Sequence, residues 1–173
     1  PTEAAILPDD RIIFDGMEIK APIPSGYPPD KSALYGISRK GIPSFAGNDP
    51  DTAGFVSAKV KSFGTYRIMV DSVPPVINNI RPWNNSTVRT ARPSIRFYMD
   101  DELSGFNSDT LLTVTLNGEY QICEYDVDHK IVYVHLTENL SPGRHELVIT
   151  ASDRVGNTTT RKSGFTYSAS SKN

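Results

Sequence analysis

Hydrophobic and polar residues alternate along much of the chain, and the clearest case lies between residues 143 and 167. Leu147, Ile149 and Ala151 occupy every second position there, which is the period of a β-strand with one buried face. Asp153 and a following Gly-Asn pair supply turn chemistry, and a second extended segment follows. This stretch therefore predicts two β-strands joined by a tight turn, typical of the last hairpin of an immunoglobulin-like sandwich.

The same pattern extends back to a pair of prolines, Pro74-Pro75, and predicts seven strands in all after them. Asn117-Gly118 is the strongest short hairpin signal among the turns that separate these strands. Short strands spaced 8–12 residues apart with turn signals between them favour a sandwich. Besides the two strands of the last hairpin, the predicted strands are 76–81, 93–99, 112–116, 119–125 and 130–136.

The residues before the proline pair predict a smaller and less regular β-domain. The stretch 22–30 is rich in proline and predicts a loop or a sheet edge. Because tandem prolines cannot continue a sheet interior, we place the domain boundary there. We expect a small β-sandwich, complete or incomplete, over residues 1–72, and an immunoglobulin-like sandwich over residues 73–173. The strands predicted in the first domain are 3–7, 11–19, 33–37, 54–60 and 65–70.

Composition supports an all-β chain and removes several classes of function. Thirteen Pro and twelve Gly interrupt every candidate long helix among the 173 residues. The net charge of −2 leaves no basic face for nucleic acid, and no apolar run reaches the roughly 20 residues of a membrane-spanning helix. Cys123 is the only cysteine, so it predicts a small apolar strand residue and not a disulfide or a zinc cluster.

Four phrases, in this order and spacing, resemble a known family. They are FGTYRIMVDSVPPVI at 63–77, IRFYMDDELSGF at 95–106, LNGEYQICEYD at 116–126 and LSPGRHELVITASDRVGN at 140–157. Together they resemble the non-catalytic, immunoglobulin-like region C-terminal to the zinc domain in lysostaphin-type metallopeptidases of Gram-negative envelopes. The resemblance covers roughly residues 55–167 and implies an extracytoplasmic bacterial protein, in the periplasm, on the outer membrane surface or secreted.

The zinc-binding motifs of that family are absent from this chain. The histidines are His129, His135 and His145, and no two of them form the His-x-His pair that supplies zinc ligands in the family. A hydrolytic zinc needs three converging protein ligands and an open fourth position. We therefore expect a non-enzymatic module, whose partners are the catalytic domain of a parent chain, the cell wall, or a surface protein or glycan.

Acidic residues follow two of the predicted strands. In an immunoglobulin topology both loops lie at the end where the chain enters, as does Asp71, so oxygen donors would gather there. One interpretation is a structural calcium, which takes 6–8 oxygen ligands; the other is that the acids bond turn amides. The candidate metal ligands are Asp71, Asp100, Asp101, Asp153 and Asn157.

Trp83 is the one tryptophan and lies beside two asparagines. An exposed indole there could stack on a sugar ring, whereas a buried one would cover the end of the core. The first arrangement favours the alternative function, an adhesin or glycan-binding module of a cell-surface protein.

Overall fold

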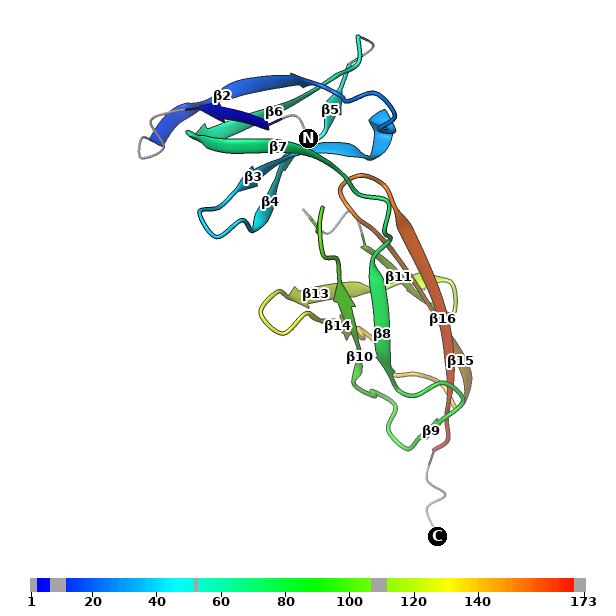
Figure 1. Ribbon diagram of the computed structural model, residues 1–173. Coiled ribbons are helices and arrows are strands. Elements are labelled where there is room, and N and C mark those ends of the chain that lie inside the picture. Colours follow the sequence, from blue (N-terminus) through cyan, green and yellow to red (C-terminus); the bar gives the residue numbers. More distant parts are fainter. Residues whose placement is uncertain (1–2, 7–11, 52, 107–111, 170–173) are drawn as a thin grey trace. The chain divides into compact units, whose positions relative to one another are not determined.

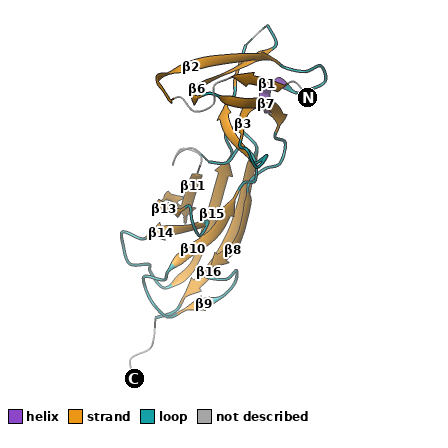
Figure 2. Cartoon of the chain, turned by 60° about the vertical axis from the view of Figure 1, so that its left-hand side comes forward, coloured by secondary structure: helices purple, strands orange, loops and turns teal. Residues whose placement is uncertain are grey.

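The computed structural model describes residues 3–6, 12–51, 53–106 and 112–169. These residues form β-strands joined by turns (Figure 1), with one 3₁₀ turn at Pro29–Lys31 (Figure 2), so the predicted all-β class is confirmed. Within them, no helix is long and apolar enough to span a membrane. By contacts the chain divides into two units. Unit 1 comprises 1–73 with 102–106 and 153–157, and unit 2 comprises 74–101, 107–152 and 158–173.

Unit 2 is a sandwich of two sheets. One has the order β13-β14-β10-β8, with β8 Val76–Arg81, β10 Ile95–Asp100, β13 Ile122–Asp126 and β14 Ile131–His135. The other has the order β12-β11-β15-β16-β9, with β9 Thr87–Val88, β11 Leu112–Leu116, β12 Glu119–Tyr120, β15 Gly143–Ser152 and β16 Thr158–Tyr167. This matches the immunoglobulin arrangement, in which strands A, B, E and D form one sheet and C, F and G belong to the other.

The core of unit 2 follows the alternation in the sequence. In β10, Ile95, Phe97 and Met99 are at most 2% exposed, while the residues between them are exposed or half-buried. In β15, Leu147 and Ile149 are buried in the same way. Such burial removes apolar surface from water on one face of each sheet, which is the main favourable term in folding.

Two details of unit 2 differ from the sequence prediction. Residues 119–125, predicted as one strand, form β12 and β13, which belong to different sheets. The chain changes sheet at Gln121, whose N–H donates to the carbonyl of Val114 at 2.9 Å. The two-residue β9, which pairs in parallel with β16, was not predicted because it is too short to show a period.

Unit 1 also contains two sheets. One has the order β1-β7-β3-β4, with β1 Glu3–Ile6, β3 Ser32–Ile37, β4 Pro43–Gly47 and β7 Gly64–Val70. The other has the order β2-β6-β5, with β2 Ile12–Pro22, β5 Asp49–Pro50 and β6 Phe55–Ser62. One apolar cluster includes Leu34 and Ile68 from the first sheet and Val56 from the second. Strands β4 and β5 were not predicted, and residues 7 and 11, the expected ends of two strands, lie outside the described residues.

A second apolar cluster of unit 1 includes residues far apart in the sequence. Ala33 and Tyr35 of β3 are buried with Val155, and Leu103 packs against them. Val155 and Leu103 belong to the 153–157 and 102–106 loops, which were expected in the C-terminal domain. Both faces of β3 are therefore covered, which explains why Ser32 to Tyr35 are buried without alternation.

Candidate functional site

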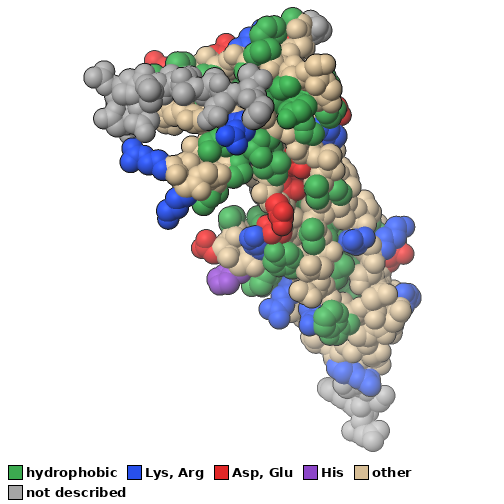
Figure 3. All heavy atoms as spheres, viewed as in Figure 1, with side chains coloured by type: hydrophobic (Ala, Val, Ile, Leu, Met, Phe, Trp, Pro, Cys, Tyr) green, Lys and Arg blue, Asp and Glu red, His purple; other side chains and the backbone are tan. Residues whose placement is uncertain are grey.

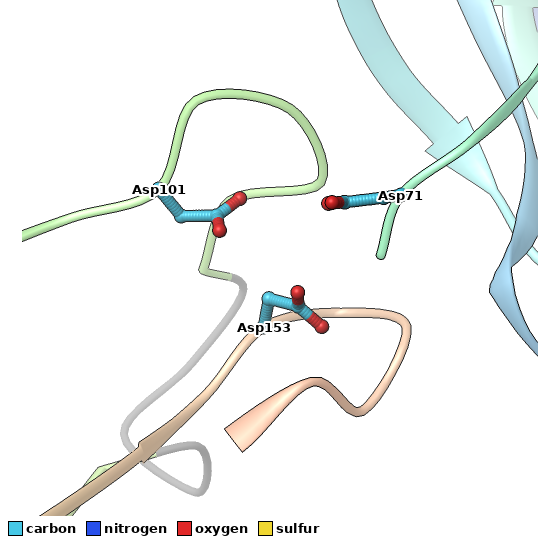
Figure 4. A group of neighbouring side chains, drawn as sticks. All are labelled: Asp71, Asp101 and Asp153. Atoms are coloured by element: carbon cyan, nitrogen blue, oxygen red, sulfur yellow. The ribbon is translucent and has the colours of Figure 1, made fainter. Parts of the chain in front are cut away.

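Three aspartates bring their carboxylates together. Asp71 follows β7, Asp153 begins the β15–β16 turn, and Asp101 directly precedes the 102–106 loop. Carboxylate oxygens of the three lie within 4.8 Å of one another, and Figure 4 shows the side chains pointing inward. Asp71 is 2% exposed and Asp153 is 1% exposed, while Asp101 is half-buried. The structure thus brings together three of the five predicted metal ligands.

Asp153 holds the β15–β16 turn through its side chain. Its Oδ1 accepts hydrogen bonds from the backbone N–H groups of Val155 (3.0 Å) and Asn157 (2.8 Å). Its Oδ2 accepts one from the side-chain amide of Asn157 at 2.7 Å. The turn also contains Gly156 at φ +78°, a conformation that glycine adopts without strain. Asp153 therefore has the turn-forming role that the sequence offered as the alternative to metal binding.

The carboxylate of Asp71 also accepts hydrogen bonds from backbone N–H groups. Its Oδ1 accepts a hydrogen bond from the N–H of Val73 at 3.1 Å, and its Oδ2 accepts one from the N–H of Ser104 at 3.0 Å. Its own carbonyl accepts the amide of Asn157 at 3.0 Å. A buried carboxylate needs such donors, because burial without partners would be costly.

Asp100 and Asn157 do not present oxygens to this acidic group. The carboxylate of Asp100 accepts hydrogen bonds from Lys130 Nζ at 2.7 Å and from the hydroxyl of Tyr98 at 3.0 Å. Burial alone would raise the pKa of Asp100, but the hydrogen bonds from Lys130 and Tyr98 outweigh it and hold the pKa below its usual value. Asn157 offers its amide N–H group, a donor, to the aspartates. As placed, neither residue is a metal ligand.

The acidic group nevertheless has capacity for a cation. Among the described residues, neither Asp71 nor Asp153 forms an ion pair, and each carboxylate oxygen can accept about two hydrogen bonds. The Oγ of Ser104, a residue 1% exposed, has no hydrogen-bond partner in the described part of the chain. Hard oxygen donors of this kind suit Ca²⁺.

The three histidines lie at three separate places. The ring of His129 contacts Asp126 Oδ2 at 2.8 Å, and the ring of His135 contacts Glu124 Oε2 at 3.2 Å, both on the surface. Hydrogen bonds from His129, first its backbone N–H and then its ring, hold the pKa of Asp126 below its usual value. His145 is buried and is held at both ring nitrogens by Asn117 and Ser141.

Trp83 is exposed, as the glycan-contact interpretation requires, with 54% of its surface accessible. The guanidinium of Arg81 stacks over the indole, 2.9 Å from the ring centroid. One face of the ring is thus occupied by a cation, an attractive arrangement for both groups.

Cys123 is half-buried, and burial raises the pKa of its thiol to about 11. A raised pKa disfavours the reactive thiolate form of this side chain.

One further feature of the fold is a pocket. Unit 2 contains an open pocket of about 420 Å³ between the β11–β12 hairpin and the segment after β14. Its lining includes Glu119, Tyr120, Gln121 and Glu138. Residues 116–121 and 136–145 come together only through the fold, so no local motif marks this pocket.

On the face of the molecule shown in Figure 3, Lys and Arg side chains are interspersed with Asp and Glu.

Comparison with known proteins does not assign the chain to a family. No protein-family model matches it, and no curated protein matches it. Among solved structures, it is similar to the crystal structure of CopC from Methylosinus trichosporium OB3b, with 10% sequence identity and a TM-score of 0.45. That similarity covers 57% of this chain and 97% of the CopC chain.

Proposed function

We propose that the chain is a non-enzymatic accessory module of an extracytoplasmic bacterial protein, which positions a cell-wall peptidase domain or contacts the cell wall or a protein partner. The observation that supports this proposal is that buried polar side chains form hydrogen bonds to loops and turns. Asp71 and Asp153 accept backbone N–H groups of loops and turns, and His145 is bonded at both ring nitrogens. These groups stabilise loops, and a stiff sandwich with ordered loops suits a scaffold or contact surface.

The resemblance to the region C-terminal to a lysostaphin-type zinc domain supports the peptidase part of the proposal. Incubation of the chain with purified peptidoglycan and Zn²⁺ should release no muropeptides, and a pull-down on insoluble peptidoglycan measures wall contact separately. Turnover that disappears in His129→Ala, His135→Ala or His145→Ala would overturn the non-enzymatic role. Sequencing the parent gene tests whether the module positions a peptidase domain. A zinc peptidase domain encoded upstream would support this role.

The exposure of Trp83 favours a second candidate, an adhesin or glycan-binding module. In that function the indole face opposite Arg81 would stack on a sugar ring. A glycan array probed with the wild-type chain and with Trp83→Ala distinguishes the two. Binding lost in Trp83→Ala supports the glycan module, and a parent gene encoding further sandwiches and a surface anchor would agree with it.

The acidic group adds a finer proposal, a structural Ca²⁺ held by Asp71, Asp101 and Asp153. The supporting observation is that three carboxylates approach within 4.8 Å, where like charges disfavour one another unless a cation offsets them. Millimolar Ca²⁺ should raise the melting temperature by roughly 5 °C relative to EDTA. Asp101→Asn should abolish this shift and Asp128→Asn, an exposed control, should keep it. An isothermal titration without heat and a melting temperature unchanged by Ca²⁺ would remove the metal.

A further inference from the structure

The pocket of unit 2 has the size of a small-molecule site. Its volume of about 420 Å³ falls within the range of typical ligand pockets, roughly 300–1,000 Å³. Leu136 and Leu140 give it an apolar part, and Glu119, Tyr120, Gln121 and Glu138 give it a polar part. None of its lining residues is Lys or Arg.

One wall of the pocket is fixed by a buried histidine. His145 Nδ1 lies 2.9 Å from the side-chain amide nitrogen of Asn117, and Nε2 lies 2.9 Å from the carbonyl of Ser141. Asn117 Oδ1 accepts the N–H of Glu146 at 3.0 Å, so the amide must present its NH₂ to His145. Nδ1 therefore accepts from this amide, and Nε2 donates to the carbonyl of Ser141. This network ties the β11–β12 hairpin to residues 141–146, which lead into and begin β15.

The opposite wall is fixed by Arg92. Its Nε donates to Asn139 Oδ1 at 2.8 Å, and its Nη2 donates to the carbonyl of Thr137 at 2.9 Å. The N–H of Leu140 donates to the carbonyl of Ala91 at 2.9 Å. These hydrogen bonds order both walls of the pocket in the absence of a ligand. Such preorganisation lowers the entropic cost of binding.

The charged side chains that line the pocket are both acidic, Glu119 and Glu138. The amide NH₂ groups of Asn117 and Gln121 are used within the protein. Among the described residues, the carboxylates of Glu119 and Glu138 make no hydrogen bond or ion pair, and the ring of Tyr120 is exposed. A cation that donates hydrogen bonds therefore complements the charge of the pocket. An ammonium group carries three donors and a positive charge, which both carboxylates and an aromatic face attract.

We propose that this pocket binds a primary ammonium group, as carried by an amino sugar or by a free amine of a peptide. The inference goes beyond the proposed function, because it names a site and a ligand class and does not depend on the parent protein. Glu119 and Glu138 pair with the ammonium, Tyr120 packs against the adjoining carbons, and Gln121 accepts a further hydrogen bond. Since both carboxylates are exposed, the affinity is modest, in the millimolar range.

The test is an NMR titration of the ¹⁵N-labelled full chain with glucosamine. Saturable shifts should appear at the amides of residues 117–121 and 137–141, and they should weaken as salt is added. N-acetylglucosamine has the same ring without the charge and should leave these amides unchanged. Nα-acetyl-lysine amide forms the second arm, and the tighter of glucosamine and this compound identifies the source of the ammonium.

Matched variants decide the outcome. The double variant Glu119→Gln, Glu138→Gln should weaken binding about tenfold or more, while Glu18→Gln, at an exposed carboxylate of β2 outside the pocket, should bind like the wild type. Dispersed spectra confirm that each variant is folded. The inference is wrong if both amines fail to shift the pocket amides, if N-acetylglucosamine binds equally well, or if the double variant is unaffected. None of these outcomes bears on the peptidoglycan cleavage assay, so the two proposals fail separately.

Discussion

A single buried carboxylate can replace several backbone partners in a tight turn, and Asp153 does so in the β15–β16 turn. Its two oxygens accept three hydrogen bonds from Val155 and Asn157. Asp153→Ala leaves these donors without partners in a buried setting and should lower the free energy of unfolding by about 2–4 kcal/mol. Urea unfolding measures it, with the exposed Asp128→Ala as the control. Equal stability of the two variants would contradict this role.

Asp100 contributes a pH-dependent part of the stability. Its hydrogen bonds to Lys130 and Tyr98 outweigh the effect of burial, so its pKa in the folded protein is below the unfolded value near 3.8. The contribution is therefore present above the unfolded pKa and is lost as the pH falls through the folded pKa. Asp100→Asn should destabilise the chain at pH 7 and much less at pH 2.5. Thermal unfolding at both pH values checks this, and a pH-independent difference would refute it.

At the scale of elements, the β11–β12 hairpin depends on one asparagine. Asn117 and Gly118 have φ values of +56° and +87°, as a type I′ turn requires. The Asn117 side chain also bonds Glu146 and His145. Asn117→Ala should cost about 2–3 kcal/mol, whereas Asn117→Gly, which removes only the bonds, should cost about 1 kcal/mol less. Chemical unfolding of both variants separates strain from hydrogen bonding, and identical losses would exclude the strain.

The strands themselves could be predicted where alternation is long, as in β10 and β15, because one buried face imposes a two-residue period. The acidic group could be predicted only in part. Asp100 is the last residue of β10 and its carboxylate contacts Lys130, while Asp101, the next residue, lies beyond the strand and joins Asp71 and Asp153. The local sequence pattern does not determine which of these two adjacent carboxylates contacts Lys130 and which joins the acidic group.

The pocket and the change of sheet at Gln121 could not be predicted for a related reason. Tyr120 and Ile122 are both apolar and both exposed, so the pattern continues without a break while the chain leaves one sheet for the other. Pairing with strands distant in sequence decides the change of sheet. In β3, by contrast, the apolar residues Ala33, Leu34 and Tyr35 follow one another without alternation, which is typical of a strand covered on both faces.

At the scale of the whole molecule, the first 73 residues do not contain all of the core of unit 1. Val155 is buried with Ala33 and Tyr35, and Leu103 packs on the same cluster. Lys31 Nζ donates to the carbonyl of Val155 at 2.9 Å, and the amide of Asn48 donates to the carbonyl of Arg154 at 3.2 Å. The cooperative unit that includes β3 therefore extends over three separate segments of the chain.

A fragment of residues 1–73 should consequently fold poorly. Losing Val155 and Leu103 exposes Ala33 and Tyr35 and forfeits roughly 1.5–3 kcal/mol for each missing side chain, against a stability of about 5–15 kcal/mol for a typical domain. The fragment should bind 1-anilinonaphthalene-8-sulfonate (ANS) and lack a sharp thermal transition. In the full chain, Val155→Ala should lower the stability by only about 1–3 kcal/mol without ANS binding. A fragment that melts cooperatively and leaves the dye unbound would show that β3 needs no cover from the distant loops.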